Sequence, residues 1–254
     1  MTVVSHAVRP GAEPFSSAGD EIGVLFCHGF TGSPASMRPW AEAVAEAGHS
    51  VELPRLPGHG TDWHELARTT WDDWFATVER SLLDLAQRCT RRFVFGLSMG
   101  GTLSLALAQA HPDLVDGLVL VNPSVMSRNR ALVALPALRH VVPALPGITN
   151  DIAKPGQDEV GYDRMPLHAL HSLTRAWPVV RAGLPAMTTP ILLLHSAVDH
   201  VVEPDSSTYL LAHVGSDDVT EVVLPDSYHV ATLDHDLPTI VERSLAFVDR
   251  LSDG

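Results

Sequence analysis

The sequence predicts a single α/β domain in which a mostly parallel β-sheet carries helices on both faces. Short apolar segments rich in β-branched residues alternate with longer segments of helical periodicity, and this alternation is typical of parallel sheets. Strands in such a sheet are buried on both faces. With 254 residues, of which 45% are hydrophobic, the chain has the size and composition of one such domain.

The first strand and helix follow a surface segment. Residues 1–20 are rich in Pro, Gly and Ser and are expected to lie extended over the surface. Ile22–Cys27 is predicted as a short buried strand, and a glycine-rich loop follows it over residues 28–32. Ser33 is expected to cap the next helix, with Pro34 at the first helical position.

Gly48 is expected to end this helix as the residue just after its last turn.

The second strand is predicted over residues 50–54 and leads into a Pro-Gly-His-Gly loop over residues 57–60. Thr70 and Asp73 have the spacing of a capping box at the start of another helix. The apolar stripe of that helix consists of Trp74, Val78, Leu82 and Leu85.

The segment from Gly96 to Gly100 reads G-x-S-x-G, with Ser98 at its centre. Residues 92–95 before it are predicted as a buried strand, and residues 102–110 after it are predicted as a helix. In the α/β-hydrolase fold this strand–turn–helix setting raises a serine hydroxyl above the sheet. Glycines flank the serine because the strained turn leaves no room for a Cβ.

The regular alternation breaks between about residues 123 and 189, where prolines are frequent and no strong strand is predicted. These prolines are Pro136, Pro143, Pro146, Pro155, Pro166, Pro178 and Pro185. In the α/β-hydrolase fold an insertion at this point forms a cap, so a single domain (1–254) with a cap insertion at about 123–189 is expected. The remaining predicted elements are strands at 117–122, 190–195 and 220–224 and a helix at 237–251.

Charge and cysteine content narrow the partners and the compartment. The 17 Lys and Arg against 30 Asp and Glu give a net charge of −13, which argues against nucleic acid or anionic lipid as a charge-driven partner. Cys27 and Cys89 are predicted to be free thiols. Neither a signal peptide nor an apolar stretch of the ~18 residues needed for a membrane span is found, so a soluble cytoplasmic protein is expected.

Ser98 needs a base to become nucleophilic, and the base needs an orienting carboxylate. In α/β-hydrolases these residues follow in the order serine, acid, histidine. Asp199 lies just beyond the carboxyl end of one predicted strand, and His229 lies in the loop beyond the next strand. Ser98, Asp199 and His229 are therefore predicted to be the catalytic residues.

Other residues of the same types compete for these roles. Asp226 is an alternative acid, but it lies on the loop of the candidate base itself. His200 adjoins the candidate acid, which leaves it little freedom to meet that side chain, and His235 lies at the start of a helix. His59 is interpreted as a histidine that structures its loop. No H-E-x-x-H motif or closely spaced cluster of metal ligands occurs, so no metal is expected.

Attack on an ester carbonyl creates an oxyanion, which two backbone N–H groups normally stabilise. One comes from the residue after the nucleophile, which is Met99. The second is assigned to Phe30 in the loop after the first buried strand. Gly29 and Gly32 are expected to let this loop approach a ligand closely.

Four segments of the chain resemble bacterial monoacylglycerol lipases and their small carboxylesterase relatives in the α/β-hydrolase superfamily. The segments are residues 28–34, 57–61, 96–102 and 226–234. The resemblance covers nearly the whole chain and implies the catalytic residues and oxyanion groups given above. It also implies that a cap glutamate, Glu159, contacts a glycerol head group and that Ile148 narrows the acyl groove. The alternative for Glu159 is a solvated surface acid.

This resemblance implies a cofactor-free serine hydrolase that cleaves carboxylic esters through an acyl-enzyme, with monoacylglycerols as the best substrate class. The alternatives are a general short-chain carboxylesterase, a carbon–carbon bond hydrolase and a binding protein that has lost catalysis. The expected partner is a small amphiphilic ester, with no nucleic acid, and a transient contact of the cap with a membrane or micelle is considered. Acyl-chain length and oligomeric state are left open.

Overall fold

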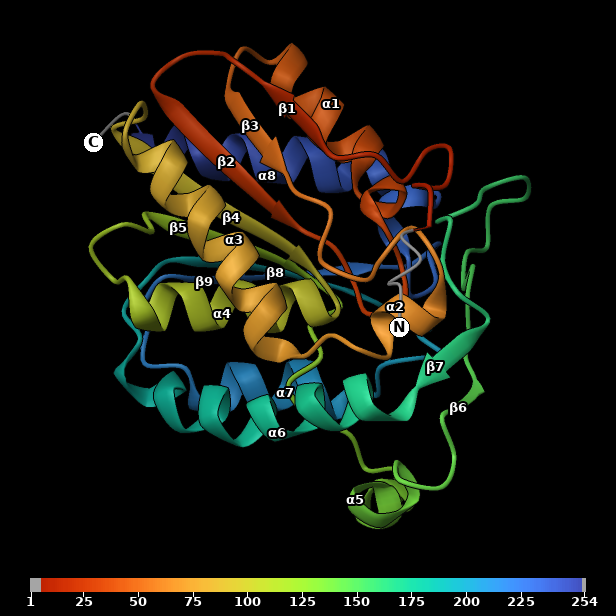
Figure 1. The fold of residues 1–254 in the computed structure, drawn as a ribbon. Coiled ribbons are helices and arrows are strands. Elements are labelled where there is room, and N and C mark those ends of the chain that lie inside the picture. The colour runs from red at the N-terminus through yellow and green to blue at the C-terminus, as the bar shows by residue number, and fades with distance from the viewer. Residues whose placement is uncertain (1–5, 253–254) are drawn as a thin grey trace.

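The computed structural model describes residues 6–252, which form a seven-stranded sheet flanked by helices (Figure 1). The strand order is β1-β3-β2-β4-β5-β8-β9, and every pairing is parallel except that of β1 with β3. The predicted fold class is confirmed. The strands are β1 Phe15–Ser17, β2 Ile22–Cys27, β3 Ser50–Leu53, β4 Arg91–Leu97, β5 Gly117–Val121, β8 Ile191–Ser196 and β9 Val219–Leu224.

Successive residues of the central strands point to opposite faces of the sheet, and both faces are buried. In β2, Leu25 packs into the core on one face while Val24 and Phe26 pack into the core on the other. In β5, Leu118 and Val119 divide in the same way. These strands are apolar throughout because neither face meets water.

The helices lie in two layers on either side of this sheet (Figure 1). The layer on one face includes α3 and α4, and the layer on the other face includes α1 and α8. The helices are α1 Arg38–Glu46, α2 Trp63–Leu66, α3 Trp71–Ala86, α4 Met99–Ala110, α5 Leu135–Leu138, α6 Leu167–Gly183, α7 Asp205–His213 and α8 Leu237–Ser252. Within residues 6–252, none of the helices is long and apolar enough to cross a membrane.

The ends of two helices test the capping predictions. The Thr70 N–H donates to the Asp73 carboxylate over 2.8 Å, so the predicted acidic capping box starts α3. Ser33 accepts from the Ala35 N–H, but it caps a 3₁₀ turn over Pro34–Ser36, and α1 begins only at Arg38. The prediction of one continuous helix from Pro34 was wrong.

The N-terminal segment does more than cover the surface. Its strand β1 adds antiparallel to the edge strand β3, with Phe15 opposite Leu53. Arg9 donates to the carbonyls of Thr61 and Gly161, so the segment also joins two loops. The first five residues of the predicted surface segment lie outside the described part of the chain.

Residues 123–189, which we call the cap, run between β5 and β8. They contain α5, α6 and a small antiparallel pair that was not predicted, β6 Ala144–Pro146 with β7 Arg164–Pro166. Pro178 was interpreted as a break in regular structure, but it lies inside α6. A proline inside a helix removes one N–H donor. Here the helix continues because its buried residues, including Leu173 and Trp177, pack on the protein.

Cys27 and Cys89 are free, as predicted, and both are buried. Burial raises the pKa of the Cys27 thiol to about 12, so this side chain stays protonated at neutral pH and packs as a small apolar group.

The carboxyl ends of the parallel strands meet at one edge of the sheet. Ser98 follows β4, Asn122 follows β5 and Asp199 follows β8. His229 follows β9, and Phe30 follows β2. The parallel topology therefore gathers residues that are far apart in the sequence.

Gly100 permits the close packing of α4 against β2. An added Cβ would lie 1.7 Å from the carbonyl oxygen of Cys27, which is rigid backbone. Alanine normally favours a helix interior over glycine by roughly 1 kcal/mol. We expect the opposite sign for Gly100→Ala, with a loss of about 3 kcal/mol, which lowers Tm by roughly 6–12 °C in a domain of this size.

Calorimetric melting of Gly100→Ala beside Gly147→Ala measures this effect. A Cβ at Gly147 would meet its nearest neighbour at an ordinary 3.5 Å, so this control should melt close to the parent protein. Equal Tm values for the two variants would show that the elbow tolerates a side chain.

Candidate active site

Ser98 occupies a strained turn between β4 and α4. Its φ of 56° and ψ of −118° lie in a region that residues with a side chain rarely adopt. Its N–H donates to the Val121 carbonyl over 3.0 Å, and its carbonyl accepts from the Ser124 N–H over 3.1 Å. A Cβ at Gly96 would lie 2.4 Å from the Gly100 carbonyl oxygen. The turn is therefore fixed by its neighbours and requires the flanking glycines.

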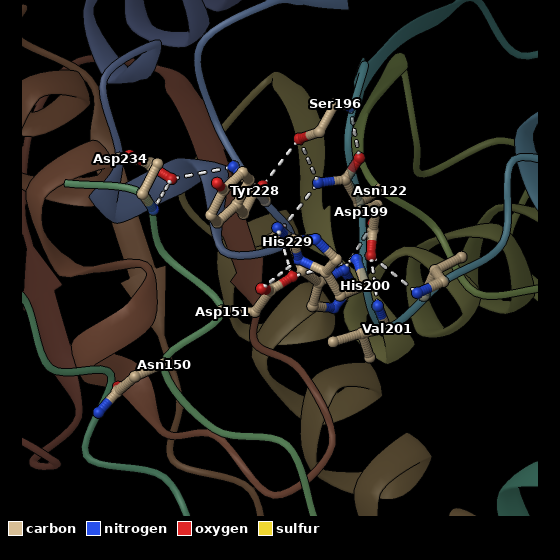
Figure 2. Close-up of polar contacts among 12 residues, drawn as sticks. Asn122, Asn150, Asp151, Ser196, Asp199, His200, Val201, Tyr228, His229 and Asp234 are labelled. Atoms are coloured by element: carbon tan, nitrogen blue, oxygen red, sulfur yellow. Dashed lines mark hydrogen bonds and ion pairs between the residues drawn. The ribbon is translucent and has the colours of Figure 1, made fainter.

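His229 and Asp199 form a buried hydrogen-bonded pair. The His229 Nδ1 lies 2.8 Å from Asp199 Oδ2, and less than a tenth of either side chain is exposed (Figure 2). The second Asp199 oxygen accepts from the N–H groups of Val201 and Val202. Burial opposes ionisation of Asp199, but the hydrogen bonds from His229 and these N–H groups outweigh it and lower its pKa.

The competing residues are placed elsewhere. Asp226 is exposed, and the hydrogen bond of its backbone N–H goes to Asp236. His200 and His235 are both exposed. His59 is buried against its own loop, and burial holds its pKa well below the usual value. Asp199 is thus the carboxylate that meets His229.

The loop after β2 is held by His28. The Leu56 N–H donates to His28 Nε2 over 3.1 Å, so the Nδ1 carries the proton that faces the Gly29 carbonyl at 3.0 Å. Burial lowers the pKa of His28 to about 4, which keeps this neutral form at neutral pH. Within residues 6–252, neither the Phe30 N–H nor the Met99 N–H donates a hydrogen bond. Both residues line the same pocket as Ser98.

A pocket of about 450 Å³ contains Ser98, Asp199 and His229 in its wall. This volume is in the range of small-molecule sites, roughly 300–1,000 Å³. Its apolar wall includes Phe30, Leu97, Met126, Leu132, Met165, Leu170, Leu173 and Trp177. Its polar wall includes Asp151 and Glu159. The pocket therefore suits a molecule with one polar and one apolar end.

Glu159 is buried, with 9% of its surface exposed, which contradicts the alternative of a solvated surface acid. Its Oε1 accepts from the Asn150 N–H over 2.8 Å, whereas Oε2 receives no hydrogen bond within residues 6–252. Burial raises the pKa of this carboxyl, opposed by the Asn150 hydrogen bond and the nearby His229. A Cβ at Gly32 would lie 3.0 Å from Oε2, so Gly32 makes room for this carboxylate.

Ile148 lies in the pocket wall, where 57% of its surface is exposed. It belongs to the cap segment after β6 and lines the same pocket as Ser98. The geometry is compatible with the groove-narrowing position implied by the sequence.

A buried polar network below the pocket was missed by the sequence analysis (Figure 2). Asn122 has a φ of 45° and donates from Nδ2 to the His229 carbonyl over 2.8 Å and to Ser196 Oγ over 3.0 Å. Its Oδ1 accepts from the Ser196 N–H, and Ser196 Oγ donates to the Tyr228 carbonyl. The network ties the ends of β5 and β8 to the loop that carries His229.

Two further acids join the cap to that loop (Figure 2). Asp151 accepts from the N–H groups of His229 and His200, and its other oxygen lies 2.7 Å from the His200 Nδ1. Asp234 accepts from the N–H groups of Tyr228, Ala153, Lys154 and His235. An aspartate shortly before or after a loop is too common in sequences to have signalled either role.

The strand order, the serine elbow and the acid–histidine pair at the carboxyl edge define an α/β-hydrolase. The family described as serine aminopeptidase, S33, matches residues 21–236, and the chain belongs to this family. Across residues 6–252, no group of three or more His, Cys, Asp or Glu side chains is arranged to hold a metal ion.

Known proteins agree with the resemblance predicted from the sequence. The chain is 43% identical over 249 residues to the thermostable monoacylglycerol lipase of Bacillus sp. (strain H-257). This alignment covers 95% of the chain and 96% of that relative. It is 24% identical to a carboxylesterase of Bacillus subtilis (strain 168), over 94% of this chain and 97% of that protein.

Solved structures agree as well. One, described with the metagenome-derived lipolytic enzymes LipS and LipT, has a TM-score of 0.93 and 41% identity over 96% of this chain and 100% of that chain. The monoacylglycerol lipase of Paleococcus ferrophilus has a TM-score of 0.76 at 20% identity, over 94% of this chain and 98% of that chain. The second likeness shows the fold alone.

Asp234 offers a test of the link between cap and histidine loop. An amide at this position can no longer accept all four N–H donors, and each lost hydrogen bond to a charged acceptor costs ~1.5–3 kcal/mol. We therefore expect Asp234→Asn to reduce the free energy of unfolding by about 3 kcal/mol at pH 7. Urea unfolding, with Asp249→Asn on the exposed face of α8 as the control, measures the loss.

The same loss should depend on pH. Burial opposes ionisation of Asp234, but its backbone hydrogen bonds outweigh burial and place its pKa below the ordinary 3.8. The ionised carboxylate therefore contributes stability above pH 3.8, and this contribution disappears as the pH falls through the lower folded-state pKa. A difference between parent and variant that stayed constant down to pH 2 would contradict the assignment.

Proposed function

We propose that this protein is a serine hydrolase of carboxylic esters and that monoacylglycerols are its preferred substrates. The observation that carries the proposal is the pocket itself. One wall holds Ser98 near the buried Asp199–His229 pair, and the polar wall holds a buried carboxylate with one unoccupied oxygen, Glu159 Oε2. Fold, family and relatives support acyl transfer as the reaction class.

In the first half-reaction, Ser98 Oγ attacks the ester carbonyl carbon while His229 Nε2 takes the hydroxyl proton. Asp199 holds Nδ1–H and so keeps Nε2 free to act as a base. The negative charge that develops on the carbonyl oxygen is stabilised by the N–H groups of Phe30 and Met99. These two donors are free of other acceptors in the described chain and cost no rearrangement when the oxyanion forms.

Collapse of the tetrahedral intermediate breaks the ester C–O bond. His229 returns its proton to the leaving glycerol oxygen, which leaves an acyl group on Ser98. Water then repeats the sequence, with His229 as base, and releases the fatty acid while Ser98 regains its proton. No cofactor is needed for this chemistry.

The glycerol head group is assigned to the end of the pocket that contains Glu159. A monoacylglycerol brings two hydroxyls into the pocket, and burying them without partners would cost free energy. The free Glu159 oxygen is an acceptor for them, and such charge-assisted bonds are stronger than neutral ones. The name of the Bacillus relative supports the same substrate class.

The acyl chain is assigned to the apolar wall under α6, with Ile148 narrowing its path. The cap presents exposed apolar side chains around this end of the molecule. They are Val133, Val141, Leu145 and Ile148. This exposure supports a transient contact of the cap with a membrane or micelle that supplies the substrate. A cytoplasmic location stays a prediction from the sequence.

A general short-chain carboxylesterase is the second candidate, and the carboxylesterase relative in Bacillus subtilis favours it. Such an enzyme would not distinguish a glycerol ester from an alkyl ester of the same acyl length. The two candidates therefore differ in the function of Glu159. A carbon–carbon bond hydrolase would use the same three residues on a different substrate. Hydrolysis of carboxylic esters would distinguish the monoacylglycerol lipase and the carboxylesterase from such an enzyme.

The catalytic assignment predicts a ranking of variants. Ser98→Ala should abolish ester hydrolysis, and Asp199→Asn should lower kcat by roughly 10³–10⁴, because the amide no longer orients the imidazole. Asp226→Asn, which changes an exposed carboxylate, should stay near the parent rate. Steady-state hydrolysis of a p-nitrophenyl ester measures all three, and a larger loss at Asp226 than at Asp199 would refute the assigned acid.

The head-group assignment predicts that Glu159→Gln lowers kcat/KM for a monoacylglycerol by roughly 10- to 150-fold, from ~1.5–3 kcal/mol for one lost charged hydrogen bond. The glutamine keeps an oxygen for the Asn150 N–H, so the cap segment is preserved. A p-nitrophenyl ester of the same chain length has no hydroxyl to hold and should react at the parent rate.

Asp163→Asn is the matched control, since this acid is exposed on the same segment and outside the pocket. An equal loss on both substrates would make Glu159 a structural residue of the cap. No loss on either substrate would remove the head-group site and favour the general carboxylesterase.

A further inference from the structure

A second, larger groove runs along the opposite side of α6 from the candidate active site. It encloses about 760 Å³ between α6 and the helices α3 and α4. Hydrogen bonds link α6 to α3 at one position and to α4 at another. The Trp71 N–H donates to Ser172 Oγ over 3.0 Å, and Gln109 Nε2 donates to the Val180 carbonyl over 2.9 Å. The groove is therefore a fixed part of the fold.

One end of the groove is rich in cationic and N–H donor groups. Arg139, His168, His171 and Arg175 all line it. Arg139 Nη1 lies 3.2 Å from His168 Nδ1, so it donates to a neutral imidazole whose other nitrogen carries the proton. Burial lowers the pKa of His171, and the neighbouring guanidinium groups of Arg139 and Arg175 lower it further.

Several arginines of the chain pair with carboxylates, as in Arg88 with Glu52, Arg92 with Asp116 and Arg250 with Asp218. Within residues 6–252, Arg139 and Arg175 have no carboxylate within 4.0 Å, although the protein carries a net charge of −13. Asp72 also lines the groove, in the first turn of α3, where the helix dipole stabilises its charge.

The other end of the groove is apolar. It is lined by Ala106 and Ala110 of α4 and by Ala176, Val179 and Val180 of α6. Val179 lines this end and is 71% exposed, so an apolar side chain of the groove is open to solvent. From His168 to Val180 the helix rises by about 18 Å, at 1.5 Å a residue. The groove therefore has the length and the polarity of an extended amphiphile with an anionic head.

We propose that this groove is a second binding site, which takes a long-chain carboxylate with its head at Arg139 and Arg175 and its chain along Ala110 and Val179. Guanidinium groups bind carboxylates through paired hydrogen bonds, and the two histidines add N–H donors. The residues lining the groove beyond Arg175 carry no charge, and the Gln109 amide among them already donates to the Val180 carbonyl, which disfavours a dicarboxylate or a polyanion. The proposal stands apart from the ester chemistry, although a fatty acid is also the product of the proposed reaction.

Helix α6 separates the groove from the candidate active site and lines both. Leu170, Leu173 and Trp177 of the same helix line the candidate active site, while the residues of the groove lie on its other side. A ligand in the groove would therefore pack against the helix that forms the acyl wall. Binding at the two sites would be coupled through the position of this helix.

Photolabelling locates the ligand directly. Dodecanoate with a diazirine on its chain, used below its micellar concentration, should label peptides of the groove that contain residues 106–110 and 176–180. The charge-reversed double variant Arg139→Glu/Arg175→Glu should reduce this labelling by at least tenfold. Arg164→Glu, an exposed arginine outside both pockets, is the matched control and should label like the parent. A neutral diazirine alcohol of equal length should not label the groove.

Ala110→Trp provides a variant that fills the apolar end and leaves the cations in place, and it should also lose the label. Groove labelling that survives both variants would overturn the proposal. Loss of binding to phosphatidylglycerol vesicles in the double variant, with dodecanoate labelling unchanged, would assign the cations to a membrane surface and would also overturn it. Labelling of the active-site wall at Leu170 and Leu173 is scored separately, so a failure of the proposed function would not be confused with a failure of this site.

Discussion

The approach of α4 to the end of β2 is the contact on which the rest of the site depends. Gly100 lies so close to the Cys27 carbonyl that no side chain fits between them. This contact places the first turn of α4 beside the loop that begins at His28. The strained Ser98 and the free N–H of Phe30 consequently line one pocket. The proposed nucleophile and a proposed oxyanion donor, from distant parts of the chain, are thereby positioned by a single packing constraint.

Buried polar groups extend this arrangement to the histidine and the cap. Asn122 holds the carbonyl of His229 from the sheet side, while Asp151 holds its N–H from the cap side. The loop of the candidate base is therefore fixed from both directions. Each of these buried groups is costly to leave unpaired, so the loop and the cap are expected to form and to open together.

The cap also sets the chemical character of the site. It contributes the buried Glu159 and the apolar wall from α6 to the pocket that contains Ser98. In the proposed function, the sheet edge provides the reacting groups and the cap provides the selectivity. Because α6 lines both this pocket and the groove along its other side, its packing influences both of them.

The sequence by itself determined the elements whose signals are local. The elbow glycines, the acidic capping box of α3 and the apolar strands follow from steric, hydrogen-bonding and burial rules that act over a few residues. The order of serine, acid and histidine was readable because parallel strands bring their carboxyl ends together. These rules predicted the fold class and the residues that line the pocket beside Ser98.

Only the tertiary structure decided the contacts between segments distant in sequence. Asp151 and Asp234 accept N–H groups from the loop of His229, Gly32 makes room for Glu159, and α6 continues through Pro178. An aspartate, a glycine or a proline looks the same in a sequence whatever it faces across 50 or more residues. The free energy of such residues depends on burial and on partners, and those are properties of the folded chain rather than of any local pattern.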